Sequence, residues 1–249
     1  MVTVHLIVPT TTEFEFAAGL RHLEGPELRI TQSHITRGPA SIESEFDELL
    51  CGAGVIENAI RAQNDGADAI VIVCMGDPAL YAVREAVSIP VLGIGETAMH
   101  YAAMLGHRFS VLPTLERRRV TYEIKARLYG LDSKLASVRP TNIPVLAIED
   151  DHTATLERLV DCAAAAIVED GADVIVLGCG CFQDMDRMME DALRQRGMNV
   201  PVIDSTPLTV LSAAALARTR LTHSKRAYPA PPPKEMKGYD LLCLARHAE

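Results

Sequence analysis

Two cysteines occupy matching places in a repeated stretch of this chain. Residues 65–74 read DGADAIVIVC and residues 170–179 read DGADVIVLGC, with seven of ten positions identical. Each copy is an apolar run typical of a buried strand, and it ends in Cys74 or Cys179. A free cysteine by itself most often fills a core. Two at matching strand ends, each followed by a helix start whose dipole favours a thiolate, predict reactive thiols instead.

Two thiols on opposite faces of one carbon are suited to proton transfer. A thiolate would remove the proton from a stereocentre next to a carbonyl, and the opposite thiol would return one, which inverts the configuration. A maleate-type cis–trans isomerase is an alternative, because there one cysteine adds to a double bond and the other returns a proton. A non-catalytic small-ligand-binding protein is a third reading, with thiols too far apart or too buried to ionise. The residues alone leave all three open.

The repeat extends over both halves of the chain. Residues 6–10 (LIVPT) match residues 110–114 (SVLPT), and residues 89–92 (IPVL) match residues 200–203 (VPVI). Strand-like segments that alternate with helices predict an α/β fold with parallel sheets. We therefore expect two pseudo-symmetric lobes, each a parallel sheet flanked by helices. Ligands bind at the carboxyl ends of such strands, so the two matching edges should form one cleft.

The elements that position these ends can be assigned from periodicity and capping signals. Ser41 is the expected N-cap of the helix 41–61, and Asp77 the expected N-cap of a helix with Pro78 in its first position. The predicted strands are 2–8, 69–74, 90–94, 108–113, 144–148, 173–178 and 201–204. The other predicted helices are 96–105, 114–129, 151–170, 183–196 and 207–218, and the Pro-rich tail 227–240 should run extended over the surface.

Composition excludes several classes of partner. The chain has 249 residues, a formal net charge of −9 and no run of Lys or Arg that stands on one face, so a phosphate backbone would be repelled. Aromatic residues make up 4% with no Trp, which removes the stacking platforms of single-strand binders. We expect no nucleic-acid partner. The six cysteines form no CxxC pair, so no metal site is expected.

The N-terminal residues and the positions of the lysines lead to predictions about location and cofactors. Residues 1–8 read as a strand with no basic region or cleavage site, and apolar runs such as 69–75 are too short to span a bilayer. We expect a cytoplasmic protein with no membrane partner, whose cysteines remain thiols. No lysine stands at a strand end to anchor pyridoxal phosphate, so no cofactor is expected.

Four segments together carry a family resemblance: 38–44 (GPASIES), 74–80 (CMGDPAL), 108–115 (RFSVLPTL) and 170–179. They closely resemble hydantoin racemases of the aspartate/glutamate racemase superfamily, with allantoin racemase as a near relative. The likeness runs from residue 2 to about residue 228. It implies a cofactor-independent racemase or epimerase with an aspartate/glutamate racemase-like fold and Cys74 and Cys179 as its catalytic pair. The implied substrate is a small cyclic ureide such as a 5-substituted hydantoin, and the implied assembly is a homo-oligomer.

The resemblance also implies a domain division and a set of binding residues. Residues 1–96 plus 207–249 would form the lobe that carries Cys74, and residues 97–206 the lobe that carries Cys179. The residues expected to bind substrate stand after strand ends or within the resembling motifs: Pro9, Thr10, Thr11, Ile42, Met75, Gly76, Asp77, Thr114, Gly180 and Cys181. For Asp77, capping alone is an equally good explanation.

Two motifs depart from the family pattern. Hydantoin racemases usually carry Asn-Pro-Asn-Thr-Thr after the first strand, where this chain has residues 8–12, VPTTT. The second cysteine usually stands in Gly-Cys-Ala-Gly, where this chain has residues 178–181, GCGC. Without the two amides, either other groups hold the substrate carbonyl or the substrate differs. Cys181 is either a small filler or a pocket residue that changes the pocket's shape.

Overall fold

The strands form two four-stranded parallel sheets in a computed structural model that describes residues 1–234 and 237. The first sheet has the order β2-β1-β3-β4 and the second the order β6-β5-β7-β8. The first-sheet strands are β1 (Val2–Val8), β2 (Leu28–His34), β3 (Ala69–Ile72) and β4 (Val91–Gly93). The second-sheet strands are β5 (Phe109–Leu112), β6 (Leu135–Val138), β7 (Val174–Leu177) and β8 (Val202–Ile203).

The same strand order in both sheets confirms the predicted duplication into two α/β halves. In each half the first strand in sequence pairs with the second and the third, and the fourth pairs with the third. Every residue of β3 and of β7 is buried. These strands read as continuous apolar runs because helices cover both faces of a parallel sheet.

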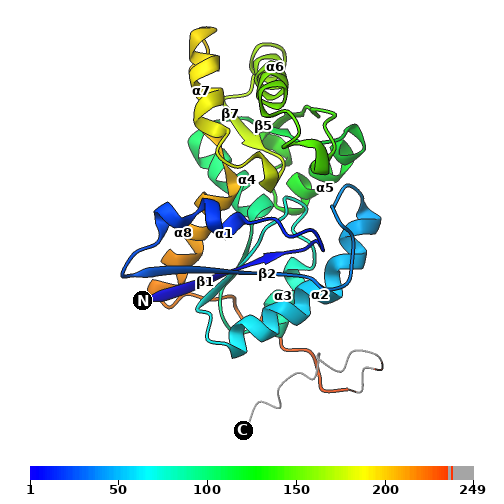
Figure 1. The fold of residues 1–249 in the computed structure, drawn as a ribbon, viewed down its shortest axis with the longest axis vertical. Helices are drawn as coiled ribbons and strands as arrows, with labels where there is room; N and C mark the ends of the chain where they lie inside the picture. Colours follow the sequence, from blue (N-terminus) through cyan, green and yellow to red (C-terminus); the bar gives the residue numbers. More distant parts are fainter. Residues whose placement is uncertain (235–236, 238–249) are drawn as a thin grey trace.

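Helices flank both sheets, and helix α4 lies between the halves (Figure 1). The helices are α1 (Phe16–Gly19), α2 (Glu45–Asn64), α3 (Leu80–Ala86), α4 (Ile94–Leu105), α5 (Arg119–Leu128), α6 (His152–Asp170), α7 (Asp186–Gln195) and α8 (Ser205–Arg218). Short 3-10 turns are η1 (Arg21–Leu23), η2 (Glu116–Arg118), η3 (Asp132–Lys134), η4 (Val145–Ala147) and η5 (Gly180–Phe182). Helix α8 packs on β1, β3 and β4 of the first sheet, while α4 contacts both α8 and β7. The division of the chain at residues 96 and 207 stays a prediction.

Two strand assignments from the sequence were wrong or incomplete. Residues 144–148 contain the turn η4 and no strand, and the strand beside β5 is β6. The segment is apolar because it is buried. Val145 and Ile148 are both buried, although neither pairs with a neighbouring strand. Strand β2 was not predicted, because its residues after Ile30 are only partly buried and polar. A short apolar run cannot by itself distinguish a strand from other buried backbone.

Both predicted N-caps were also wrong. Helix α2 begins at Glu45, and its N-cap is Ser44, whose hydroxyl accepts the N–H of Asp47 at 3.2 Å; Ser41 lies upstream of the cap. Asp77 does not cap the helix that follows it, because α3 begins at Leu80. Its carboxylate instead accepts the N–H groups of Gly95 and Glu96, at 2.9 and 2.6 Å, in the first turn of α4. Asp77 therefore does cap backbone N–H groups at the start of a helix. That helix is α4, which follows β4, and not α3.

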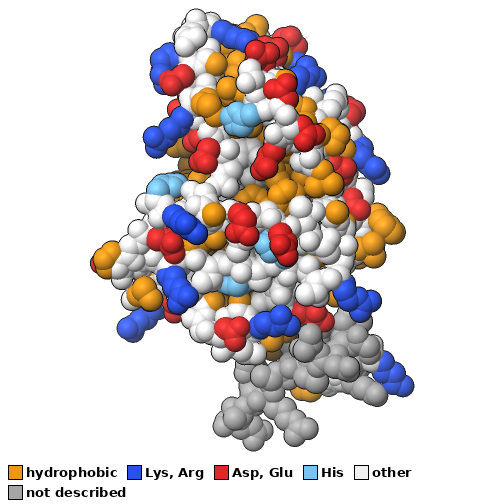
Figure 2. All heavy atoms as spheres, viewed as in Figure 1, with side chains coloured by type: hydrophobic (Ala, Val, Ile, Leu, Met, Phe, Trp, Pro, Cys, Tyr) orange, Lys and Arg blue, Asp and Glu red, His pale blue; other side chains and the backbone are white. Residues whose placement is uncertain are grey.

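The surface carries charges of both signs. In Figure 2, Lys and Arg side chains are interspersed with Asp and Glu side chains, with no large area of one sign on this face. Within residues 1–234, no helix is long and apolar enough to cross a membrane. Residues 227–234 of the Pro-rich tail form neither helix nor strand, and Tyr228 stacks on Tyr81 with ring centroids 6.0 Å apart. The rest of that tail, apart from residue 237, and Cys243 lie outside the described residues.

Candidate active site

A cavity lies where the carboxyl ends of strands from both sheets meet. It encloses about 520 Å³ of empty space, open solvent at its mouth included. The segments that follow β1, β3, β5 and β7 all contribute to its wall. Its lining residues are Val8, Pro9, Thr10, Phe14, Phe16, Ile42, Val73, Cys74, Met75, Gly76, Thr114, Arg118, Tyr122, Val145, Gly178, Cys179, Gly180 and Cys181.

All but two of the site residues expected from the sequence line this cavity. Thr11 is exposed, and its N–H and hydroxyl both donate to the carbonyl of Pro39, at 2.9 and 3.3 Å. Asp77 is buried behind the cavity wall, where it also accepts the hydroxyl of Tyr129 at 2.6 Å. These two residues therefore do not line the cavity: Thr11 holds the first loop to Pro39, and Asp77 holds the loop after β3 to α4.

Cys74 is held as a neutral thiol by its surroundings. Burial raises the pKa of the Cys74 thiol well above its usual value, and the Glu48 carboxylate raises it further. The guanidinium of Arg118 and the N–H of Gly76 act in the opposite direction on this pKa, but they do not outweigh burial. At neutral pH the Cys74 thiol is therefore protonated.

Cys179 has the opposite tendency. A hydrogen bond from the Cys181 thiol lowers the pKa of Cys179 below its usual value, although burial opposes this. The N–H of Cys181 and the charge of Arg118 also lower the pKa of Cys179. The same hydrogen bond, together with burial, raises the pKa of Cys181, so Cys179 is the more acidic of these two thiols. The cavity can therefore hold one thiolate and one thiol at the same time.

The sequence analysis missed two cavity residues from the start of α5. Tyr122 is buried, and its hydroxyl donates to the carbonyl of Gly178 at 2.7 Å, directly before Cys179. The guanidinium of Arg118 lies over the Tyr122 ring, 5.8 Å from its centroid. Polar residues recur here at helical spacing, at positions 118, 122, 125 and 129. That spacing places them on one face of the helix, and it was the available signal.

Two phenylalanines and a valine complete the wall on the apolar side. Phe14 and Phe16 follow the first strand, with ring centroids 6.0 Å apart. Val145 reaches the cavity from η4, and its N–H donates to the Glu43 carboxylate at 2.8 Å. This bond joins segments 102 residues apart in sequence, one before α2 and one after β6. Sequence alone offered no pairing signal for it.

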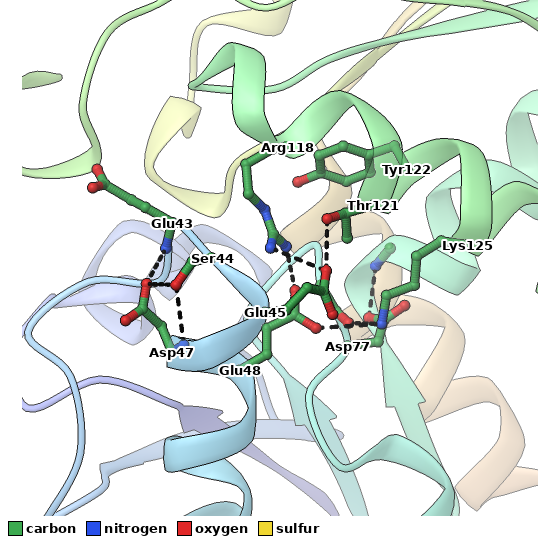
Figure 3. A network of polar contacts seen from close by, with 12 residues as sticks. Glu43, Ser44, Glu45, Asp47, Glu48, Asp77, Arg118, Thr121, Tyr122 and Lys125 are labelled. Atoms are coloured by element: carbon green, nitrogen blue, oxygen red, sulfur yellow. Dashed lines mark hydrogen bonds and ion pairs between the residues drawn. The ribbon is translucent and has the colours of Figure 1, made fainter.

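A network of polar and charged side chains joins the second half to the first (Figure 3). Arg118 donates to Glu48 on α2 and Lys125 lies 3.6 Å from the same carboxylate. The hydroxyl of Thr121 donates to Glu45 at 2.6 Å. Lys125 also donates to the carbonyl of Gly76, in the loop that carries Cys74. Helix α5 thereby holds the loop of one cysteine in a fixed place relative to the other half.

Comparisons with known proteins agree with the geometry. Residues 4–213 match the family described as Asp/Glu/Hydantoin racemase. A hydantoin racemase of Pseudomonas sp. (strain NS671) is 35% identical over 240 residues, 94% of each chain. A hydantoin racemase of Paenarthrobacter aurescens is 38% identical over 202 residues, 80% of this chain and 84% of that one.

A solved structure shares the whole architecture. Allantoin racemase from Klebsiella pneumoniae superposes with a TM-score of 0.89 and 32% sequence identity, covering 97% of this chain and 99% of that one. The expected resemblance to hydantoin racemases and the expected racemase-like α/β fold are both confirmed.

Proposed function

The chain belongs to the Asp/Glu/Hydantoin racemase family, and we propose that it racemises a small cyclic ureide with Cys74 and Cys179 as its two proton-transfer groups. Its similarity to known racemases identifies the chain as a racemase, an isomerase that acts on a small molecule. The observation that carries the two-cysteine mechanism is the pair of thiols in one cavity, with pKa values displaced in opposite directions.

The reaction begins at Cys179 in this proposal. Its thiolate removes the proton from the stereocentre, and the electrons of the C–H bond move to the adjacent carbonyl oxygen to form an enolate. The Cys74 thiol then donates its proton to the opposite face of the carbon. Turnover leaves the charge on Cys74, and the displaced pKa values return it to Cys179, with the proton passing back to Cys74.

The cavity wall supports a cyclic ureide with an apolar substituent, such as a 5-substituted hydantoin. Phe14, Phe16, Ile42 and Val145 form apolar wall that a substituent could contact. The hydantoin C–H lies next to a ring carbonyl, so its removal yields the enolate that the mechanism needs. The buried Thr10 and Thr114 stand at matching ends of β1 and β5 and supply hydroxyls for ring polar atoms.

Deuterium exchange tests this proposal. Wild-type protein should racemise enantiopure 5-substituted hydantoins or allantoin in deuterated water, with label entering the stereocentre of either enantiomer. Cys74→Ser and Cys179→Ser should each lose interconversion by roughly 10²–10⁴-fold, the scale of one positioned acid or base. Each should still exchange label into one enantiomer, and the two variants should prefer opposite ones.

The buried Cys162 provides a matched control. Its thiol donates to the carbonyl of Pro140 at 3.6 Å, in the core of the second half, so Cys162→Ser should racemise at the wild-type rate. Full activity of Cys74→Ser would contradict the two-base mechanism. Conversion of a cis-alkene diacid to its trans form without exchange would favour the isomerase reading. Ligand binding without either reaction would favour the non-catalytic reading.

We also propose that the chain acts as a cytoplasmic homo-oligomer. Exposed apolar residues gather on two helices joined by the ion network, Phe46, Leu49 and Leu50 on α2 and Val120, Ile124 and Leu128 on α5. Such faces are typical of protein contacts. Light scattering during size-exclusion chromatography measures the assembly directly, and a monomer at micromolar concentration would contradict this part of the proposal.

A further inference from the structure

Arg118 lies in the cavity wall, and one nitrogen of its guanidinium makes no hydrogen bond to the described residues. It is the last residue of η2, its side chain is 3% exposed, and it lines the cavity beside Gly76 and Tyr122. Its Nη2 donates to the buried Glu48. Its Nη1 is buried but has no hydrogen-bond acceptor among the residues that the structure describes. A buried charged donor without an acceptor is costly, and at a cavity wall it indicates that a ligand oxygen is the acceptor.

The backbone near Cys74 is shaped around this guanidinium. A Cβ atom added to Gly76 would lie 1.9 Å from Glu48 Oε1 and 3.0 Å from Arg118 Nη2. Only glycine therefore allows the loop after Cys74 to lie against the ion pair. Arg118 lines the same cavity as Cys74 and Cys179, and its positive charge acts to lower the pKa of both thiols.

The charges around Arg118 indicate which kind of oxygen it serves. Glu48 pairs with Nη2, and Glu45 Oε1 lies 3.5 Å from Nη1, an ion-pair distance without hydrogen-bond geometry. Together with Lys125, these groups carry two positive and two negative charges. The cluster thus has no excess positive charge to attract a substrate carboxylate. A carbonyl oxygen that gains charge only during the reaction is a better acceptor for Nη1, which makes no hydrogen bond of its own to the described residues.

We propose that Nη1 of Arg118 donates a hydrogen bond to the substrate carbonyl oxygen next to the acidic carbon and stabilises the enolate formed there. This inference rests on the proposed racemase function. Arg118 stays protonated throughout, so it stabilises charge and moves no proton. A donor that acts on developing charge affects the transition state more than the bound substrate, so its loss should lower kcat more than it raises KM.

Substitution of Arg118 tests the role through the kcat and KM split. Arg118→Gln should lower kcat by about 10²–10³-fold, the scale for one oxyanion donor, with a smaller change in KM. The loss should grow as the substrate C–H becomes less acidic across a series of 5-substituted hydantoins, because less acidic substrates depend more on enolate stabilisation. A purely structural role would give the same loss for every substrate. Arg117→Gln is the matched control, since Arg117 is exposed and does not line the cavity.

A second variant guards against misfolding, because Arg118→Gln leaves the Glu48 carboxylate buried without its partner. The double variant Glu48→Gln with Arg118→Gln removes both charges and should show the same fall in kcat. Glu48→Gln alone keeps the guanidinium and should retain much more activity than the double variant. An unchanged kcat in folded Arg118→Gln or in the folded double variant would overturn the proposal.

A binding measurement separates this inference from the proposed function. Barbiturate is a cyclic ureide that exists as an enolate at neutral pH, and 5,5-dimethylhydantoin is a neutral cyclic ureide without an acidic C–H. By calorimetry, Arg118→Gln should weaken barbiturate binding by about tenfold to a hundredfold, the range for one charge-assisted hydrogen bond, and leave 5,5-dimethylhydantoin nearly unaffected. Equal losses for both probes, or no barbiturate binding to the wild type, would overturn the role of Arg118. Failure of racemisation with this binding pattern intact would overturn the proposed function alone.

Discussion

Replacing Cys181 by alanine should raise the pKa of Cys179 and shift the pH dependence of activity. The hydrogen bond from the Cys181 thiol is the largest cause of the lowered pKa at Cys179. Alanine removes that donor but keeps the backbone N–H at position 181, which also bonds to Cys179. Hydrogen bonds to charged groups contribute about 1.5–3 kcal/mol. Because one pKa unit corresponds to about 1.4 kcal/mol, the expected rise is about 1–2 units.

The assay is the pH profile of kcat/KM, which reports ionisations of the free enzyme. The acid limb of Cys181→Ala should lie about 1–2 pH units above that of the wild type, so activity falls about 10–100-fold on the acid side. At pH values above both limbs the two proteins should converge. The shift should be the same for both enantiomers, because their equilibrium constant is unity and fixes the ratio of their kcat/KM values. Ultraviolet absorbance of the thiolate gives an independent titration.

Cys162→Ala is the control for this experiment, since it removes a buried thiol from the core of the second half without touching the cavity. Its profile should coincide with that of the wild type. If the acid limb of Cys181→Ala stayed at the wild-type position, the thiol–thiol hydrogen bond would not be what activates Cys179.

Two further predictions concern the loop after Cys74. Gly76→Ala should lower both activity and melting temperature, because its Cβ would meet the Glu48 carboxylate; Gly25→Ala, with nothing within 4 Å of the added Cβ, should change neither, and an active Gly76→Ala would contradict this packing. Burial raises the pKa of Asp77 to about 6, so the folded state binds its proton more tightly than the unfolded state. Stability from this group is therefore lost as pH rises from about 4 to 6, by roughly 3 kcal/mol, and stays constant above. The free energy of unfolding, measured with urea across that pH range, should fall less steeply for Asp77→Asn than for the wild type. An equal slope for the two proteins would refute the raised pKa of Asp77.

Periodicity and the repeat were sufficient to predict most of the architecture. Continuous apolar runs before Cys74 and Cys179 predict buried parallel strands, because such strands are covered on both faces. The carboxyl ends of parallel strands meet at one edge, so the two cysteines and the residues after β1 and β5 could be placed around one cavity from order alone. The repeat added the second half by symmetry, and the structure confirms it.

Side chains that reach across the halves were beyond the sequence. Nothing in the spacing of Arg118 and Glu48 predicts their ion pair, since the two residues are 70 positions apart and lie in η2 and α2, in different halves of the chain. The same holds for Asp77, whose carboxylate caps a helix 18 residues later instead of the one it precedes. Capping and pairing are determined by which backbone groups come near in space.

The sequence by itself determined the fold class, the location of the cavity and the two thiols that face it. The periodicity of each strand and the succession of strands along the chain can both be read from the sequence. Only the tertiary structure decided how those thiols differ. Their pKa values depend on burial and on neighbours brought close by packing, Glu48 beside Cys74 and Cys181 beside Cys179. Matching positions in a repeated sequence are therefore chemically unequal, because electrostatic energy depends on distance in space and not on separation along the chain.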